Sequence, residues 1–225
     1  MRASNALFIQ AGLRGAAIIV GLRAEARLAL PLGVPIYVGG GTAAGAAEAS
    51  RRAVAGAASA LISLGLAGGL DPALRPGDVT VPEAVLTGGR VFPADPLLGR
   101  TLGGMTPHRI LGAASVVADV LSKDRFRDET GAVAVDRESG AVATLATERG
   151  LPFAALRVIC DPAERALPPA ALVALNRRGA IGMVRMLDSI LAHPVQVPAL
   201  LALARDAAKA RRALAQRIAS IVAGA

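Results

Sequence analysis

The chain has 225 residues, enough for one domain with a full hydrophobic core, and 53% of them are hydrophobic while only 2% are aromatic. It carries 25 basic and 17 acidic residues, a net charge of +8, so its surface should attract nucleic acid, anionic lipid or an anionic substrate. Nucleic-acid-binding domains usually add aromatic stacking platforms or a recognisable module, and the sequence offers neither, so we do not expect a nucleic-acid partner.

Cysteine and histidine are scarce, which limits the chemistry further. The single Cys160 cannot form an internal disulfide, which fits a reducing cytoplasm, and with two histidines it leaves little material for a zinc site. The amino end shows no secretory signal, and no uncharged apolar run of 18 residues has the character of a membrane span. We therefore expect a cytoplasmic protein with no bound metal.

The first predicted elements are two strands with a helix between them. Ala16–Val20 and Val34–Val38 are β-branched runs, and Arg23–Leu30 is helical. Glu25 lies in the first turn of this helix, where the helix dipole favours a carboxylate even without a function. The second strand runs into Gly39-Gly40-Gly41-Thr42, and a helix is expected to follow. Such glycines let backbone N–H groups approach a phosphate or ribose, although a tight turn explains them equally well.

A third strand, Ala60–Leu66, opens into the glycine-rich segment Gly65–Leu70. Further along, Gly88–Gly104 is predicted to be a loop-rich insertion, and long segments without structure often cover a ligand. Three more elements are expected: strands at Val79–Val81 and His108–Leu111, and a helix capped by Ser122-Lys123-Asp124.

The stretch from Gly131 to Asp161 reads as strand, helix, strand. Ala132–Val135 and Phe153–Ile159 are buried apolar runs, and the helix between them stops at Gly150-Leu151-Pro152. Glu138 follows the first strand and Asp161 follows the second. Because open α/β sheets bind ligands outside the carboxyl ends of their strands, we expect both acids at the edge where chemistry takes place.

The carboxyl-terminal third is predicted to be helical at Leu172–Leu175, at Ile181–Leu191 and in a last helix, Ala199–Val222, within residues 194–225. Its basic residues alternate with Leu, Ala and Ile; they are Arg205, Lys209, Arg211, Arg212 and Arg217. This basic amphipathic pattern suits either docking on the protein's own core or lying on an anionic membrane surface. The pattern alone leaves both open.

Three elements, in order along residues 16–165, resemble those of the nucleoside phosphorylase and nucleosidase superfamily. They are Gly65–Leu70 with Gly77-Asp78-Val79 (G-x-A-G-G-L…G-D-V), Val135–Ser139 (V-D/E-M-E-S/A) and Arg157–Asp161 (R-x-I-S-D). A glycine-rich turn by itself does not explain three such elements in one order. The resemblance implies a single domain over residues 1–225, folded as a three-layer α/β/α sandwich around a twisted mixed sheet, in a homo-oligomer.

Two later segments, Asp161–Leu175 and Pro198–Ala208, are most similar to the hopanoid-associated phosphorylases within this superfamily. Those proteins are held to cleave adenine from adenosylhopane, a nucleoside whose 5′ carbon carries a triterpenoid. The resemblance thus implies a small-molecule nucleoside substrate linked to a lipid, and peripheral contact with the inner membrane face. An ordinary nucleosidase for methylthioadenosine or adenosylhomocysteine is the enzymatic alternative, and a non-catalytic nucleoside- or lipid-binding homologue is the other.

The resemblance also implies roles for individual residues. Asp161 would be the general acid that shares a proton with N7 of the departing purine. Glu138 would accept hydrogen bonds from the ribose hydroxyls, and Glu25 would lie near the attacking nucleophile. Backbone N–H groups on the nucleophile side would come from four small residues: Gly40, Gly65, Ala67 and Gly68. No cofactor is implied, with inorganic phosphate as the one candidate co-substrate.

The sequence departs from the superfamily pattern in two places. Arg137 replaces a methionine that packs against the sugar; it would pair with Asp136 or Glu138, hold phosphate, or spoil ribose binding. Ser63 and Leu66 stand where phosphorylases place an arginine and a serine around these glycines. Without that pair, phosphate binding is in doubt and hydrolysis becomes credible.

Overall fold

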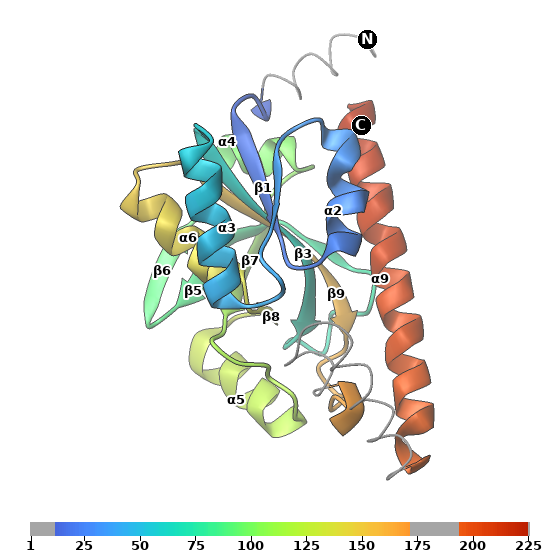
Figure 1. Cartoon of the computed structure of the whole chain (residues 1–225). Helices are drawn as coiled ribbons and strands as arrows, with labels where there is room; N and C mark the ends of the chain where they lie inside the picture. The colour runs from blue at the N-terminus through green and yellow to red at the C-terminus, as the bar shows by residue number, and fades with distance from the viewer. Residues whose placement is uncertain (1–11, 172–193, 225) are drawn as a thin grey trace.

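A computed structural model describes residues 12–171 and 194–224, which form a nine-stranded sheet with helices on both faces (Figure 1). The strands are β1 (Ala16–Val20), β2 (Ile36–Val38), β3 (Ala60–Gly69), β4 (Val79–Thr80), β5 (Pro82–Thr87), β6 (Arg90–Pro93), β7 (Thr106–Gly112), β8 (Ala134–Asp136) and β9 (Phe153–Asp161). The described helices are α2 (Arg23–Ala29), α3 (Ala43–Ala55), α4 (Pro96–Thr101), α5 (Val120–Thr130), α6 (Ser139–Glu148) and α9 (Val197–Ala223), with 3-10 turns η1 (Leu30–Leu32) and η2 (Pro194–Gln196).

Strand β3 is the centre of the sheet. It pairs in parallel with β1 and, along most of its length, with β9, and it pairs antiparallel with β8 only at Gly68 and Gly69. The path across the sheet is β2-β1-β3-β8-β7-β5-β6, with β9 also pairing with β4. The sheet is therefore mixed, as expected.

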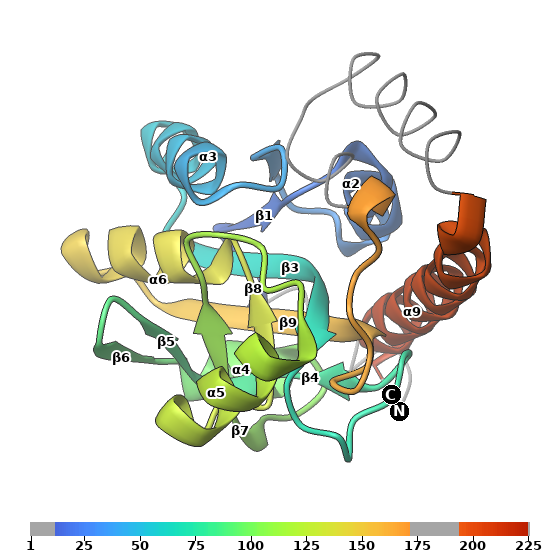
Figure 2. The same cartoon turned by 90° about the horizontal axis from the view of Figure 1, so that it is seen from below.

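The two faces of the sheet follow the alternation of side chains along each strand. On β9, Ala154, Leu156 and Val158 join one core cluster, which α2, α4 and α9 cover. The intervening Ala155 and Ile159 join the other cluster, with α3 and α6. Figure 2 shows α2 and α9 apart from α3 and α6, so the predicted three-layer α/β/α arrangement is confirmed.

The last helix docks on the core. Its four buried residues, Ala210, Leu214, Ile218 and Ile221, recur every three or four positions and so form one stripe. They belong to the core cluster on the α2 face of the sheet. Within residues 12–171 and 194–224, no helix is long and apolar enough to cross a bilayer. Membrane contact by the outer face of α9 stays a prediction.

Two local expectations are wrong. Gly88–Gly104 is not a loop-rich insertion, because Gly88 and Gly89, with φ of 55° and 71°, make a two-residue hairpin turn between β5 and β6. Helix α4 follows, capped by Asp95, whose Oδ1 accepts hydrogen bonds from the N–H groups of Leu97 and Leu98 at 2.9 Å. Likewise α5 is capped by Asp119 and not by Ser122–Asp124, because Asp119 Oδ1 accepts from the N–H of Ser122.

The remaining expectations differ only at element ends or cannot be compared. Strand β2 begins at Ile36 and not at Val34, β8 runs to Asp136, and β9 extends to Asp161. The helices predicted at Leu172–Leu175 and Ile181–Leu191 lie outside the described residues.

Candidate active site

Parallel strands bring two of the three candidate acids to β3, and an antiparallel strand brings the third. Glu25 follows β1 and Asp161 ends β9, and both strands run parallel to β3, so their carboxyl ends meet at one edge. Strand β8 is antiparallel to β3, with Val135 opposite Gly68. The chain after Val135 therefore runs back along β3, which carries Glu138 towards Glu25 and away from the end of the strand.

A buried arginine holds the turn that carries Glu138. Arg157 Nε donates to Asp136 Oδ2 at 2.5 Å, and Nη2 donates to Ser63 Oγ at 2.6 Å and lies 3.9 Å from Glu138 Oε2. Asp136 Oδ1 in turn accepts from the backbone N–H of Glu138 and of Ser139 at 2.8 Å each, at the start of α6. This network fixes the backbone of Glu138, from which the side chain extends.

The carboxyl groups of Glu25 and Glu138 lie on either side of Gly21. A Cβ built at Gly21 would be 2.5 Å from Glu138 Oε1 and 3.3 Å from Glu25 Oε2. Glu25 Oε2 accepts from the N–H of Leu22 at 2.8 Å, and Oε1 accepts from the N–H of Leu66 at 3.3 Å. The two acids are therefore neighbours, and only a residue without a side chain fits between them.

Burial raises the pKa of both carboxyl groups. Desolvation raises the pKa of Glu25, against the opposing effect of the Leu22 N–H and the Arg157 charge. Desolvation, with the Asp136 and Glu25 carboxyls, raises the pKa of Glu138 to about 7, although Arg157 opposes it. A carboxyl group with a pKa near neutrality, such as that of Glu138, is suited to general acid and base catalysis.

Asp161 lies further along β3 and has a partner that the sequence analysis did not identify. The Nζ atom of Lys123 on α5 donates to Asp161 Oδ2 at 2.6 Å, with 0% and 6% of the two side chains exposed. The other oxygen, Oδ1, lies 3.3 Å from Cys160 Sγ. Burial raises the pKa of the Cys160 thiol well above its usual value, with the Asp161 charge adding to the effect. The thiol is thus a neutral neighbour of the acid.

Small residues on β3 bring the backbone against these acids. A Cβ at Gly65 would be 2.9 Å from Glu25 Oε1, and a Cβ at Gly68 would be 3.2 Å from both carboxylate oxygens of Asp161. Ala67, between them, is buried and faces α3 and α6. Gly65 and Gly68 are three residues apart, about 10 Å along a strand. Glu25 and Asp161 therefore approach β3 at two separate points, one at Gly65 and the other at Gly68.

The Gly39–Gly41 turn has a structural explanation. A Cβ at Gly39 would be 2.8 Å from the backbone nitrogen of Ala46, and Gly40 and Gly41 have positive φ. Arg137 donates from Nε to the carbonyl oxygen of Gly41 at 2.9 Å, so it ties this turn to the Glu138 turn. Gly40 as a ligand-binding residue stays a prediction.

The residues in the phosphorylase positions are both engaged within the protein. Ser63 is fully buried and its hydroxyl accepts from Arg157, while the backbone N–H of Leu66 donates to Glu25. A cavity of about 340 Å³ lies next to this region, between α3 and α6, and Arg137 forms part of its wall. None of Glu25, Glu138 and Asp161 lines this cavity.

Comparison with known proteins gives the same architecture. Residues 108–192 match the family model described as Phosphorylase superfamily. The chain has the fold of nucleoside phosphorylases and nucleosidases. It is similar to the structure of a 5′-methylthioadenosine/S-adenosylhomocysteine nucleosidase from Helicobacter pylori, with a TM-score of 0.69 and 14% identity over 92% of this chain and 97% of that one. None of the curated proteins matches the sequence.

Two further structures of this fold are similar. A futalosine hydrolase of Helicobacter pylori gives a TM-score of 0.63 and 16% identity, with 79% of this chain and 97% of that chain covered. An S-adenosylhomocysteine nucleosidase from Streptococcus pyogenes gives a TM-score of 0.60 and 19% identity, with 78% of this chain and 95% of that chain covered. The hopanoid-associated relationship is not shown by these comparisons.

Lys123, the partner of the candidate acid Asp161, is a residue that the sequence analysis did not single out, because its pattern predicts a helix cap there. A signal was available in its spacing to Phe126, three residues later and half-buried in the small core cluster under α5. Residues three apart share a helix face, so an apolar Phe126 that packs inward predicts that Lys123 also faces the interior.

Proposed function

We propose that this protein cleaves the N-glycosidic bond of a purine nucleoside. The observation that carries the proposal is the placement of three acids beside β3: buried Glu25 lies against Gly65, half-buried Glu138 lies next to Glu25 at Gly21, and buried Asp161 lies against Gly68. Breaking a glycosidic bond sends negative charge into the base and leaves positive charge on the sugar. An acid at the base can protonate it, and a carboxylate at the sugar can stabilise the positive charge there.

At the base end, Asp161 would hold the purine through its carboxyl group and share a proton with N7. Electrons of the breaking bond between C1′ and the base nitrogen flow into the ring, and the proton neutralises them there. At the sugar end, Glu138 would accept hydrogen bonds from the ribose hydroxyls. Its carboxylate would also stabilise the positive charge that develops on the ribose ring.

Water is the nucleophile that this geometry favours. Glu25 and Glu138 place acidic groups where the nucleophile would arrive, and a phosphate dianion is repelled by carboxylates. Burial raises the pKa of Glu25, which makes its carboxylate a stronger base for the proton of an attacking water. The Ser63 hydroxyl already accepts a hydrogen bond from Arg157 inside the protein, so it is not placed to bind phosphate. We therefore favour hydrolysis over phosphorolysis.

The deciding experiment measures free adenine released from methylthioadenosine, adenosylhomocysteine and adenosylhopane, each with and without inorganic phosphate. We expect release that does not need phosphate. Dependence on phosphate would instead make the protein a phosphorylase. Binding of nucleosides without release of base from any of them would support the non-catalytic alternative and contradict our proposal.

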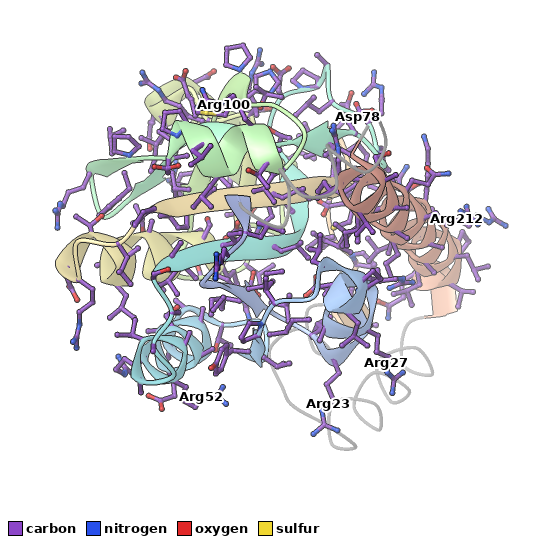
Figure 3. The ribbon with its side chains drawn as sticks, turned by 90° about the horizontal axis from the view of Figure 1, so that it is seen from above. Arg23, Arg27, Arg52, Asp78, Arg100 and Arg212 are labelled. Atoms are coloured by element: carbon purple, nitrogen blue, oxygen red, sulfur yellow. The ribbon has the colours of Figure 1, made fainter. Side chains whose placement is uncertain are left out.

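A lipid-linked substrate is the second candidate, and one surface feature favours it. In the part of the chain that the structure describes, six of the nine exposed large hydrophobic side chains lie along the edge formed by α2, α9 and their 3-10 turns: Leu22, Leu30, Val195, Val197, Leu201 and Val222. Arg23 and Arg27 of α2 and Arg212 of α9 project outward from the same two helices (Figure 3). Exposed apolar and basic groups together suit the surface of an anionic bilayer.

Vesicle binding tests this second candidate separately from catalysis. We expect the protein to sediment with vesicles of anionic lipid and not with vesicles of neutral lipid. Charge reversal at Arg23, Arg27 and Arg212 should abolish sedimentation while leaving cleavage of soluble methylthioadenosine unchanged. Equal sedimentation with both lipids, or none, would remove the membrane-linked substrate. The homo-oligomer stays a prediction that sedimentation equilibrium can check.

A further inference from the structure

Helix α5 is attached to the body of the protein through a charged side chain. Lys123 is the one buried residue of α5, and its side chain is 0% exposed, while most of the helix is polar and faces solvent. A buried lysine is costly unless its charge is paired and its N–H groups are bonded. The position therefore requires an explanation beyond the apolar packing that usually holds a surface helix.

The ammonium group of Lys123 has three N–H donors and three acceptors around it. They are Asp161 Oδ2 at 2.6 Å, the carbonyl oxygen of Pro162 at 2.8 Å and the carbonyl oxygen of Arg165 at 2.9 Å. One side chain thus bonds the carboxylate and two points of the backbone that follows it. The group is fully satisfied, which makes it a rigid support.

We propose that Lys123 is a positioning residue that fixes Asp161 by its Oδ2 atom and presents Oδ1 to the purine, an inference that rests on the proposed function. Oδ1 has Cys160 Sγ at 3.3 Å, and because a thiol is only a weak donor, this oxygen can instead carry the proton that it shares with the acceptor N7 of the purine. Gly68 contributes no side chain beside the carboxylate, since a Cβ there would be 3.2 Å from either oxygen. Lys123 thus holds Oδ2, while Oδ1 has the weaker thiol as its partner.

Kinetics of Lys123→Met test the proposal, with Lys209→Met on α9 as the matched control. We expect kcat to fall about 10- to 100-fold, because an ångström of displacement at a reacting group costs that much, while KM changes less than about threefold. Lys123→Arg, which keeps the charge, should recover part of the loss. A folded Lys123→Met protein with unchanged kcat overturns the proposal.

A double-mutant cycle separates positioning from general stability. If Lys123 acts only through Asp161, adding Lys123→Met to Asp161→Asn should leave the residual rate unchanged within about twofold. The double variant also removes both charges, so it gives an answer even where Lys123→Met alone does not fold. A further fall of about tenfold or more in the double variant would show that Lys123 acts elsewhere.

The crystal structure of the Lys123→Met or double variant distinguishes failure of this proposal from failure of the proposed function. If the wild-type protein releases no base, the proposed function fails, but the structure still tests Lys123. We expect residue 161 to rotate away from Gly68 and residues 162–165 to shift. An unchanged side chain and backbone would overturn the positioning role whatever the activity.

Discussion

Arg157 and Asp136 form an ion pair inside the protein, with Nε 2.5 Å from Oδ2 and only 1% of each side chain exposed. The pair joins β9 to the turn that starts α6, so it sets the position of the neighbouring Glu138. Removing one partner of a buried pair leaves the other charge without compensation. The stability of the site and its geometry therefore depend on the same contact.

Arg157→Met should lower the free energy of unfolding by about 3–5 kcal/mol, because Asp136 is then buried without its counter-ion. Urea denaturation measures this. Arg109→Met is the matched control, since Arg109 pairs with Glu83 on the surface with 52% and 43% of the side chains exposed. That change should cost about 0.5 kcal/mol. Similar losses for the two variants would contradict the assigned importance of the Arg157 pair.

Folding stability should fall as pH rises from about 4.5 to 7. The pKa of Glu138 is raised from 4.5 to about 7 in the folded protein, so the folded state binds more protons in this window. Such a group stabilises the fold below its unfolded pKa and loses that contribution as pH rises through the folded pKa. The loss is roughly 3 kcal/mol at most. Denaturation at several pH values should show it, and Glu138→Gln should flatten the curve.

Asp161→Asn should leave the protein folded and slow base release by roughly 10²- to 10⁴-fold, the range for losing a general acid. The amide keeps an oxygen to accept from Lys123, and the two carbonyl contacts of that lysine remain. Asp128→Asn, an exposed position on α5, serves as the control. Rates near that of the wild type for Asp161→Asn would remove Asp161 from the site.

Gly65→Ala should slow base release about 10- to 100-fold by displacing Glu25, whose Oε1 would be 2.9 Å from the new methyl group. Gly150→Ala is the control. Gly150 has φ of 63° and open space around it, so alanine there adds backbone strain of about 1 kcal/mol away from the acids. Activity should survive that change. Equal rates for the two variants would show that Gly65 affects only stability.

Leu214→Ala should destabilise the protein by about 2–5 kcal/mol, because Leu214 of α9 is fully buried against the sheet. Leu201→Ala, on the same helix but 52% exposed, should change stability by less than about 0.5 kcal/mol. Thermal unfolding compares them. A small effect at both positions would mean that α9 does not depend on core docking.

The sequence predicted the elements whose signal is local. Ala16–Val20 was predicted with its observed ends, and Phe153–Ile159 was predicted two residues short, because buried strands of a parallel arrangement are unbroken apolar runs. The candidate acids followed from strand ends, since chain direction brings carboxyl ends together. For Glu138 that reasoning was incomplete. The antiparallel pairing of β8 with β3, which no local pattern records, takes it back towards Glu25.

Only the tertiary structure decided which charges meet. Lys123 and Asp161 are 38 positions apart, and Arg157 and Asp136 are 21 apart, so neither pair has a periodicity to reveal it. The docking of α9 was likewise open, because a basic amphipathic pattern is the same whether its apolar stripe faces a core or a lipid. Local sequence records backbone preference and side-chain alternation. Pairing of buried charges depends on which distant elements exclude water from the same space.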